Sequence, residues 1–264
     1  MTKTHTKLQL VGGGKMGQAL LHGLLRTGWA SPNELVIVEV DESQRSVLAE
    51  TFPGVTVTET SQATVDTVVA VKPHIVTAVC EQLDSPARVL SIAAGIKIST
   101  IQNLVGEDVA VLRVMPNTPA LVGEGVSALA GGTSAGKQDL EWAAEVMRAV
   151  GPLVMVDESQ LDAVTGLSGS GPAYVFAMTE ALVEAGVAAG LEQTTAETLA
   201  HQTVYGSARL LHESDLGPAK LREQVTTPGG TTAAGLEVLT AQLPQLMTDT
   251  VAAATARSIE LGDQ

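Results

Sequence analysis

The residues near the N-terminus whose types and spacing indicate chemistry are four glycines. Residues 12–17 read Gly-Gly-Gly-Lys-Met-Gly, directly after the apolar run 8–11 and before a helical pattern over about 15–28. In a Gly-x-Gly-x-x-Gly turn, the glycines allow the tight bend, the approach of the backbone to a pyrophosphate, and close helix–strand packing. The first amides of the helix then face the phosphates. The turn therefore predicts dinucleotide binding by Gly12, Gly13, Gly14, Lys15, Met16 and Gly17.

An acidic residue near the end of the second apolar run indicates which dinucleotide is bound. Glu39 follows Gly17 by 22 residues, near the roughly 20 expected of a ribose-binding carboxylate. Such a carboxylate accepts hydrogen bonds from the ribose hydroxyls and repels a 2′-phosphate. Arg45 is the nearest cation, and Lys15 could face phosphate instead. The sequence therefore favours NAD(H) over NADP(H), although a solvated strand end could carry the same glutamate.

Three later turns follow predicted strands and carry small, cyclic or amide residues. Ala70–Pro73 ends with lysine and proline, and Ser91–Gly95 is small enough to leave room for a ring. Arg113–Pro119 holds Asn117 between two prolines. Ligands of open α/β sheets bind outside the carboxyl ends of the strands. Three such ends, on a sheet that also carries the glycine fingerprint, outline one cleft.

The apolar periodicity predicts the sheet that must position these turns. Runs that are apolar on both faces and alternate with helical patterns are typical of parallel strands covered by helices. The predicted strands span residues 8–11, 35–40, 65–71, 89–92 and 109–114. We therefore expect an α/β, Rossmann-type, doubly wound dinucleotide-binding domain over residues 1–165.

The pattern becomes helical from about residue 165 onward. Helices are expected over 172–189, 194–212, 218–225, 232–240 and 244–261, giving an all-helical domain over residues 166–264. Many of their residues are alanine or glycine. Such surfaces let helices approach closely, and they fit either a subunit interface or packing within the chain.

A turn between two of these helices, Thr227–Thr232, reads Thr-Pro-Gly-Gly-Thr-Thr. Its glycines and the first amides of the next helix can present several N–H donors to a carboxylate. The threonine hydroxyls add donors, although either could instead cap the helix. Ser168–Pro172, at the expected domain junction, is typical of a cap and hinge.

Composition excludes several function classes. The 264 residues are 45% hydrophobic and 17% charged, which excludes a disordered chain. The net charge of −14 and the scarcity of aromatic residues disfavour nucleic acid and anionic membranes as partners. No stretch reaches the ~18 apolar residues of a membrane span. Anionic ligands must therefore be held by local features such as helix N-termini.

Compartment and metal chemistry can also be addressed from the sequence. The segment Met1–Lys7 is polar, so no signal peptide is expected. Cys80 is the only cysteine, which fits a reducing cytoplasm. The five histidines form no ligand-spaced pair, so no metal site is expected.

The motifs at 12–17, 70–73, 91–95, 113–119, 168–174 and 227–232, in this order, closely resemble the pyrroline-5-carboxylate reductase family. The late Pro-Gly-Gly-Thr-Thr turn together with Met-Pro-Asn-Thr-Pro is the most specific part. Two departures are visible. Thr227 replaces the family's usual serine, with the hydroxyl retained, and Glu39 stands where NADP-using members often carry Ser, Thr, Asn or Arg.

The resemblance implies reduction of a cyclic imine, 1-pyrroline-5-carboxylate, to L-proline by NAD(P)H, the last step of proline synthesis. It implies a helical dimerisation domain that intertwines with a partner, an active site between subunits, and a homo-oligomer of such dimers up to a decamer. Substrate-binding residues would be Met115, Asn117, Gly229, Gly230, Thr231 and Thr232, with the Thr232 hydroxyl on the ring nitrogen as the catalytic group. The nicotinamide half would be lined by Ala70, Val71, Lys72, Pro73, Ala93, Ala94, Gly95 and Asn117.

Two alternatives remain open on the sequence. A related imine reductase or β-hydroxyacid dehydrogenase of the same plan would need a catalytic lysine, and Lys220 is the only lysine after Lys137. A non-catalytic protein that senses nucleotides would bind the cofactor without turnover. A serine-hydrolase elbow and a P-loop both fail on pattern, at residues 166–170 and after Lys15 respectively.

Overall fold

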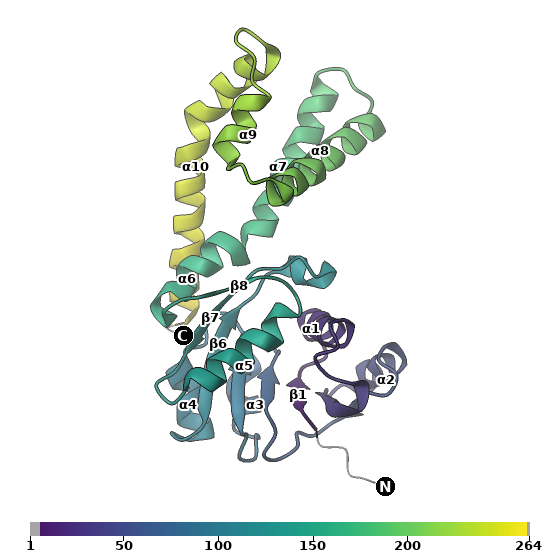
Figure 1. Ribbon diagram of the computed structural model, residues 1–264, viewed down its shortest axis with the longest axis vertical. Helices are drawn as coiled ribbons and strands as arrows, with labels where there is room; N and C mark the ends of the chain where they lie inside the picture. Colours follow the sequence, from purple (N-terminus) through teal and green to yellow (C-terminus); the bar gives the residue numbers. More distant parts are fainter. Residues whose placement is uncertain (1–5, 263–264) are drawn as a thin grey trace. The chain divides into compact units, whose positions relative to one another are not determined.

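A computed structural model of the chain describes residues 6–262, which fall into two compact units (Figure 1). The first unit runs to Ser170 and also includes the C-terminal stretch from Ala252, and the second comprises Gly171–Val251. The sequence expectation placed residues 166–264 in one helical domain, whereas here the end of the last helix clusters with the first unit. Periodicity identifies a helix but not the unit on which its end packs. The expectation about Met1–Lys7 rests mostly on residues outside the described range.

The first unit contains one sheet of eight strands in the order β3-β2-β1-β4-β5-β6-β7-β8. Neighbouring strands pair in parallel except β6 and β7, which are antiparallel. The strands are β1 (Leu8–Val11), β2 (Leu35–Val38), β3 (Thr56–Thr58), β4 (Thr67–Val69), β5 (Arg88–Ser91), β6 (Ala110–Met115), β7 (Ser127–Gly131) and β8 (Leu153–Met155). The order of the first six confirms the doubly wound fold.

Three of these strands are absent from the sequence prediction, each for a physical reason. β3 and β8 have three residues each and lie at the two edges of the sheet, so they present almost no periodicity. β7 has the sequence Ser-Ala-Leu-Ala-Gly and contains no β-branched or aromatic residue. Its pairing with β6, rather than its own propensity, makes it a strand.

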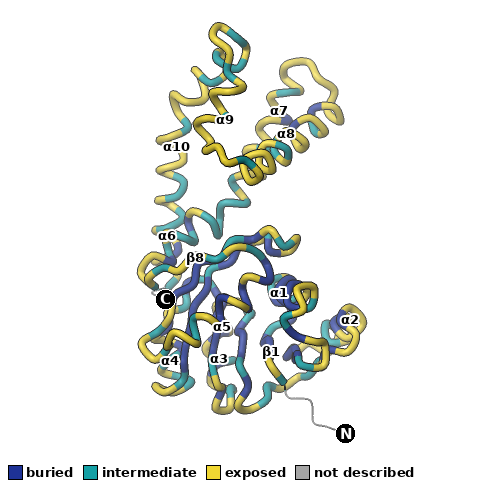
Figure 2. The backbone as a smooth tube through the Cα atoms, in the orientation of Figure 1, coloured by how far each residue is buried: buried dark blue, intermediate teal, exposed yellow. Residues whose placement is uncertain are grey.

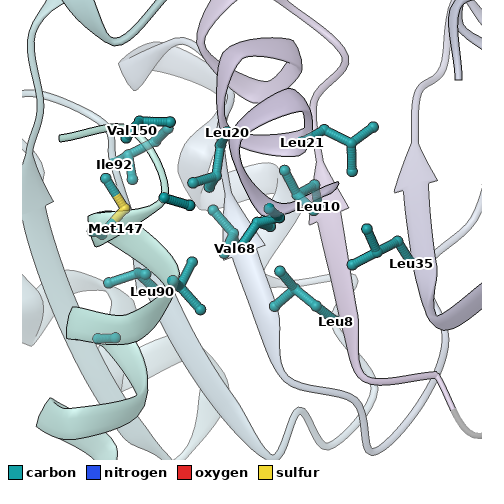
Figure 3. Packing of buried hydrophobic residues seen from close by; sticks show 14 of the residues in the cluster. Leu8, Leu10, Leu20, Leu21, Leu35, Val68, Leu90, Ile92, Met147 and Val150 are labelled. Carbon is teal, nitrogen blue, oxygen red and sulfur yellow. The ribbon is translucent and has the colours of Figure 1, made fainter. Parts of the chain in front are cut away.

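Helices cover both faces of the sheet. The α-helices of this unit are α1 (Lys15–Arg26), α2 (Glu42–Thr51), α3 (Val76–Cys80), α4 (Ile98–Val105), α5 (Lys137–Arg148) and α6 (Leu161–Val164). One buried cluster joins Leu10, Val68 and Leu90 to side chains of α1 and α5 (Figure 3). A second joins Val69 and Val89 to α3 and α4. Successive strand residues enter opposite clusters, which explains why the runs are apolar on both faces.

Five short helical turns complete this unit. Four are 3₁₀ turns, η1 (Pro32–Glu34), η2 (Pro73–Ile75), η3 (Thr118–Val122) and η4 (Glu158–Gln160). The fifth, η5 (Thr165–Gly169), is a π-helical turn in which the Ser170 amide donates to the Thr165 carbonyl at 2.8 Å. π-helical turns are rare and often occur at functional sites. The segment expected to act as a cap and hinge therefore begins within a π-turn.

The second unit is helical, with α7 (Gly171–Ala188), α8 (Gln193–Glu213), α9 (Pro218–Gln224) and most of α10 (Thr231–Gly262). The expectation of two helices over 232–240 and 244–261 is wrong, because α10 continues through Pro244. Proline removes one helical donor and crowds the carbonyl four residues earlier. Pro244 and Thr240 are both exposed, so water can bind the carbonyl that loses its partner.

The helices of the second unit bury few of their apolar residues. Its one buried apolar cluster consists of Val183, Ala196 and Ala200. Phe176 and Tyr205 keep 63% and 58% of their surface exposed, and much of α7 and α8 is exposed along its length (Figure 2). A large exposed apolar surface marks an interaction site. Of the two interpretations left open above, this favours the subunit interface. Within residues 6–262, no helix is both long and apolar enough to cross a membrane.

Candidate active site

The glycine turn lies between β1 and α1, beside the end of β4. Gly12 has φ +111°, and a Cβ there would lie 2.7 Å from the Ala70 carbonyl oxygen. A Cβ on Gly17 would lie 2.3 Å from the Gly12 carbonyl oxygen, so this glycine allows α1 to pack on the strand. A Cβ on Gly14, in contrast, would meet nothing within 4 Å. The backbone at Gly14 is therefore open, as a pyrophosphate bound at the start of α1 requires.

Glu39, just after β2, points back to this turn. Its Oε2 accepts a hydrogen bond from the Gly13 amide at 3.0 Å, and its Oε1 accepts one from the Asp41 amide at 3.1 Å. Arg45 donates to the carbonyls of Glu39 and Val40 at 2.9 and 2.8 Å. The Glu39 carboxylate is thus fixed beside the glycine turn. Arg45, the nearest cation in the sequence, already donates to backbone carbonyls.

A second carboxylate, Asp41, lies close to Glu39 as the N-cap of α2. It accepts hydrogen bonds from the Ser43 hydroxyl and the Gln44 amide. These bonds, from Ser43 first, hold the pKa of Asp41 below its usual value. Asp41 is therefore an anion near neutral pH, and its charge opposes the approach of a further phosphate.

A cavity of about 240 Å³ opens at the carboxyl ends of β4, β5 and β6. It brings together residues that the sequence predicted from separate motifs, namely Met16, Ala70, Val71, Ala94, Met115 and Asn117. It also contains residues that the prediction missed, namely Ile92, Pro116, Thr118 and Gly169. Ile92, Pro116 and Thr118 lie within the predicted turns. Gly169 belongs to η5, and nothing in the sequence shows which strand end η5 packs against.

Other predicted residues lie outside this cavity. Pro73 and Gly95 line a neighbouring cavity of about 650 Å³, together with Ala94 and Ser258 of α10. The Ser258 hydroxyl donates to Asp162 Oδ1 at 2.6 Å, which fixes the end of α10 at this cavity. Lys72 is exposed, and Ala93 is buried with 4% of its surface accessible.

Asn117 is nearly buried, with 9% of its surface exposed, and both ends of its amide are bonded. Its Nδ2 donates to the Ser168 carbonyl at 3.1 Å, and its Oδ1 accepts from the Val126 amide at 2.9 Å. Asn117 could therefore bind a ligand only through the second N–H of its Nδ2 or the second lone pair of its Oδ1. The geometry instead shows Asn117 joining the loop after β6 to η5.

The predicted carboxylate-binding turn lies in the second unit, immediately before α10. The Gly230 amide donates to the Thr227 carbonyl at 3.0 Å, and Gly229 has φ +72°. Proline followed by a glycine of positive φ is the sequence of a type II turn. Because α10 begins at Thr231, Gly230 takes the N-cap position, and neither threonine is the N-cap. The amides of Thr231 and Thr232 have no partner within the helix, so they can donate to an anion.

Cys80, on α3, does not contribute a reactive thiol. It is 1% exposed, and burial raises the pKa of its thiol to about 11. The thiol therefore stays protonated at neutral pH, whereas the thiolate is the nucleophile. Among the described residues, His, Cys, Asp and Glu side chains form no group of three or more that could hold a metal ion.

The class of protein follows from the first unit. A glycine turn of this geometry lies where the strand order reverses between β1 and β4, the position at which doubly wound sheets bind dinucleotides. Residues 7–95 match a family model described as NADP oxidoreductase, coenzyme F420-dependent. The chain is thus an oxidoreductase with a nicotinamide dinucleotide site.

Full-length relatives identify the family. The chain is 40% identical to pyrroline-5-carboxylate reductase of Arabidopsis thaliana, over 97% of this chain and 95% of the relative. It is also 40% identical to the Synechocystis reductase, over 97% and 98%. Residues 158–261 match the family model for pyrroline-5-carboxylate reductase dimerisation. The chain belongs to the pyrroline-5-carboxylate reductase family.

Solved structures agree with this assignment. The reductase from Coxiella burnetii superposes with a TM-score of 0.89 at 34% identity, covering 98% of both chains. The Plasmodium falciparum enzyme, solved with NADP bound, gives 0.80 at 28% identity, covering 98% of this chain and 99% of that one. The resemblance stated from the motifs is therefore confirmed over nearly the whole chain.

We predict that Gly12→Ala abolishes most binding of the reduced cofactor. The new Cβ would meet the Ala70 carbonyl, and the backbone at φ +111° is strained for any L side chain. Gly28→Ala is the matched control, because Gly28 has φ +70° but open space around its Cβ position. Fluorescence titration with NADH should show loss of binding for Gly12→Ala and wild-type affinity for Gly28→Ala. Equal binding by both variants would contradict this role of Gly12.

Proposed function

We propose that this protein reduces 1-pyrroline-5-carboxylate to L-proline with a reduced nicotinamide cofactor. The observation that carries the proposal is the Thr227–Thr232 turn, whose geometry exposes the first backbone amides of α10. The same chain also carries the glycine turn expected to bind a dinucleotide. A substrate with a carboxylate next to a cyclic imine needs these two features and no metal or thiolate. The full-length identity to named reductases supports the same reaction.

The first unit would hold the cofactor. The pyrophosphate would bind at Gly14 and the start of α1, and Glu39 would accept hydrogen bonds from the adenosine ribose. The cavity lined by Ala70, Ala94 and Met115 would receive the nicotinamide ring. When bound, the reduced nicotinamide supplies the hydride. The chain's own contribution is position, because a small displacement of the reacting atoms strongly lowers the rate.

The second unit would hold the substrate. The amides of Thr231 and Thr232 would bind its carboxylate, as the N-terminus of a helix binds anions. The Gly230 amide, also expected from the sequence to bind it, already donates to the Thr227 carbonyl. The Thr232 hydroxyl would donate a hydrogen bond to the ring nitrogen and assist its protonation as the adjacent carbon accepts the hydride. A local site of this kind is necessary in a chain with a net charge of −14, which otherwise repels anions.

The β-hydroxyacid alternative depends on Lys220, which lies on the short helix α9. Its Nζ is 2.7 Å from Glu223 Oε2, and 69% of the side chain is exposed. A lysine that is exposed and paired with a carboxylate lacks the enclosed, desolvated setting in which a lysine acts as a general base. The geometry around Lys220 therefore favours the imine reductase over the hydroxyacid dehydrogenase.

We further propose that NADH is preferred to NADPH. Glu39 and Asp41 place two carboxylates at the end of β2, and Arg45 is bonded to backbone carbonyls rather than free for a 2′-phosphate. Arg45 also lies 3.7 Å from Glu59 Oε2, which adds a third acidic group. A 2′-phosphate would enter a region of negative potential.

The assembly is proposed to be a homo-oligomer of intertwined dimers, with a decamer as the larger form. The exposed apolar groove between α7 and α8, lined by residues such as Phe176, Val183 and Tyr205, supports a subunit contact in the second unit. Residues 158–261 match the dimerisation model of the family, which supports the dimer. The cytoplasm is the proposed location.

The reaction is tested with purified protein, 1-pyrroline-5-carboxylate and NADH. We expect the decrease in NADH absorbance to match the L-proline formed, mole for mole. A β-hydroxyacid with NAD⁺ is the parallel assay for the alternative enzyme. NADH binding without turnover in either assay, neither NADH consumed with the imine nor NADH formed from the β-hydroxyacid, would instead support the nucleotide sensor and refute the proposed reaction.

We predict that Glu39→Ser shifts the cofactor preference towards NADPH. The substitution removes the charge that repels a 2′-phosphate and frees the Gly13 amide. A charge repulsion worth about one to two pKa units corresponds to roughly a 10–100-fold change in binding. The ratio of kcat/KM for NADPH to that for NADH should therefore rise ~10–100-fold. Glu42→Ser is the control, because it removes an exposed carboxylate three residues after Glu39, in the first turn of α2. An unchanged ratio would show that Glu39 does not select the cofactor.

We predict that Thr232→Ala lowers kcat by ~10²-fold, in the range for loss of one proton-donating group. Thr232→Ser should keep most of the rate because it retains the hydroxyl. Thr240→Ala is the control. It removes a hydroxyl on the same helix that donates to the Leu236 carbonyl, and it should leave the rate unchanged. A wild-type rate for Thr232→Ala would remove the proton-donating role from this residue.

A further inference from the structure

The bond between Asn117 and Ser168 joins the loop after β6 to the π-helical turn η5. The Asn117 Nδ2 donates to the Ser168 carbonyl at 3.1 Å. Ser168 is partly buried and lies within η5, two residues before the bend at Ser170 that precedes α7. Two residues that are 51 positions apart in the sequence therefore meet in one hydrogen bond.

A second contact lies beside this bond. A Cβ on Gly169 would lie 2.4 Å from Met115 Cε, so the Met115 side chain packs directly against the Gly169 backbone. Met115, Asn117 and Gly169 all line the 240 Å³ cavity at the ends of β4–β6. The side of Asn117 that does not face η5 is also fixed, because its Oδ1 accepts from the Val126 amide at 2.9 Å.

We infer that Asn117 is a positioning residue and not a ligand-binding one. Its amide bridges the backbone at Val126 and Ser168, and thereby holds Gly169 and Met115 as one wall of the cavity. The inference rests on the proposed function, in which this cavity receives the nicotinamide ring. It replaces the expectation that Asn117 contacts the cofactor or the substrate. Met115 and the η5 backbone, rather than the Asn117 amide, define the shape of the wall.

The test is a double-mutant cycle of Asn117→Ala and Gly169→Ala. One substitution removes the bond to Ser168 and the other displaces Met115, so both disturb the same wall, and the loss of Asn117 should matter less in the Gly169→Ala background. We expect Asn117→Ala alone to lower kcat by about 10-fold, with the NADH dissociation constant changed less than about 2-fold. In the Gly169→Ala background the loss should be clearly smaller. The isotope effect with 4-deuterated NADH should rise for Asn117→Ala, because misalignment slows the hydride step.

Two single variants separate the parts of the wall. Asn117→Asp keeps the acceptor for Val126 but places a carboxylate oxygen against the Ser168 carbonyl, so it should lower kcat at least as much as Asn117→Ala. Gly169→Ala should displace the Met115 methyl group and lower kcat while NADH still binds. Gly206→Ala is the matched control, since a Cβ there meets nothing within 4 Å.

Three outcomes would overturn the inference. A weaker NADH or substrate affinity for Asn117→Ala, equal with and without Gly169→Ala, would show direct ligand contact. A lower thermal midpoint with unchanged kcat and isotope effect would show a purely structural role. Absence of any coupling between the two substitutions, in both kcat and the thermal midpoint, would show that Asn117 does not hold the wall formed by Gly169 and Met115. If the wild-type protein does not reduce the imine, the proposed function fails, and the coupling in the thermal midpoint still tests the bond.

Discussion

The close approach of β1 and β4 at their carboxyl ends is the constraint on which the cofactor half of this molecule depends. The backbone of Gly12 passes the Ala70 carbonyl so closely that no side chain fits, and α1 starts within the same turn. Because β1 and β4 are neighbours although two strands separate them in the sequence, the chain leaves the sheet in opposite directions at this point. The crevice this leaves is occupied by small residues of three strand ends.

The same turn fixes the electrostatics of the site. Gly13 donates its amide to Glu39, so the carboxylate proposed to bind the ribose is positioned by the turn proposed to bind the pyrophosphate. Arg45 neutralises part of the local charge by bonding to backbone carbonyls rather than by facing outward. In the proposed site, backbone amides rather than side-chain cations would face the anion, which would allow a chain with a net charge of −14 to bind a dinucleotide.

Much of the first unit could be predicted from the sequence because its signals are local. Five central strands are apolar on both faces, and the glycine turn follows one of them at once. Edge strands β3 and β8 could not be found, since three residues carry no period, and β7 exists through its pairing with β6. The continuity of α10 was missed because proline usually ends a helix. Pro244 is exposed, so water can bond to the carbonyl that Pro244 leaves without a donor, and the helix continues.

The wall of the cavity shows which contacts the sequence does not reveal. Asn117 and Ser168 each belong to a motif identified in the sequence, yet neither motif indicates that the two residues bond. The Asn117 amide donates to the partly buried Ser168 carbonyl and accepts from the Val126 amide, so both ends of its side chain bond to the backbone. These bonds link the loop after β6 to η5, and through Gly169 and Met115 they shape the surface against which a nicotinamide ring would lie.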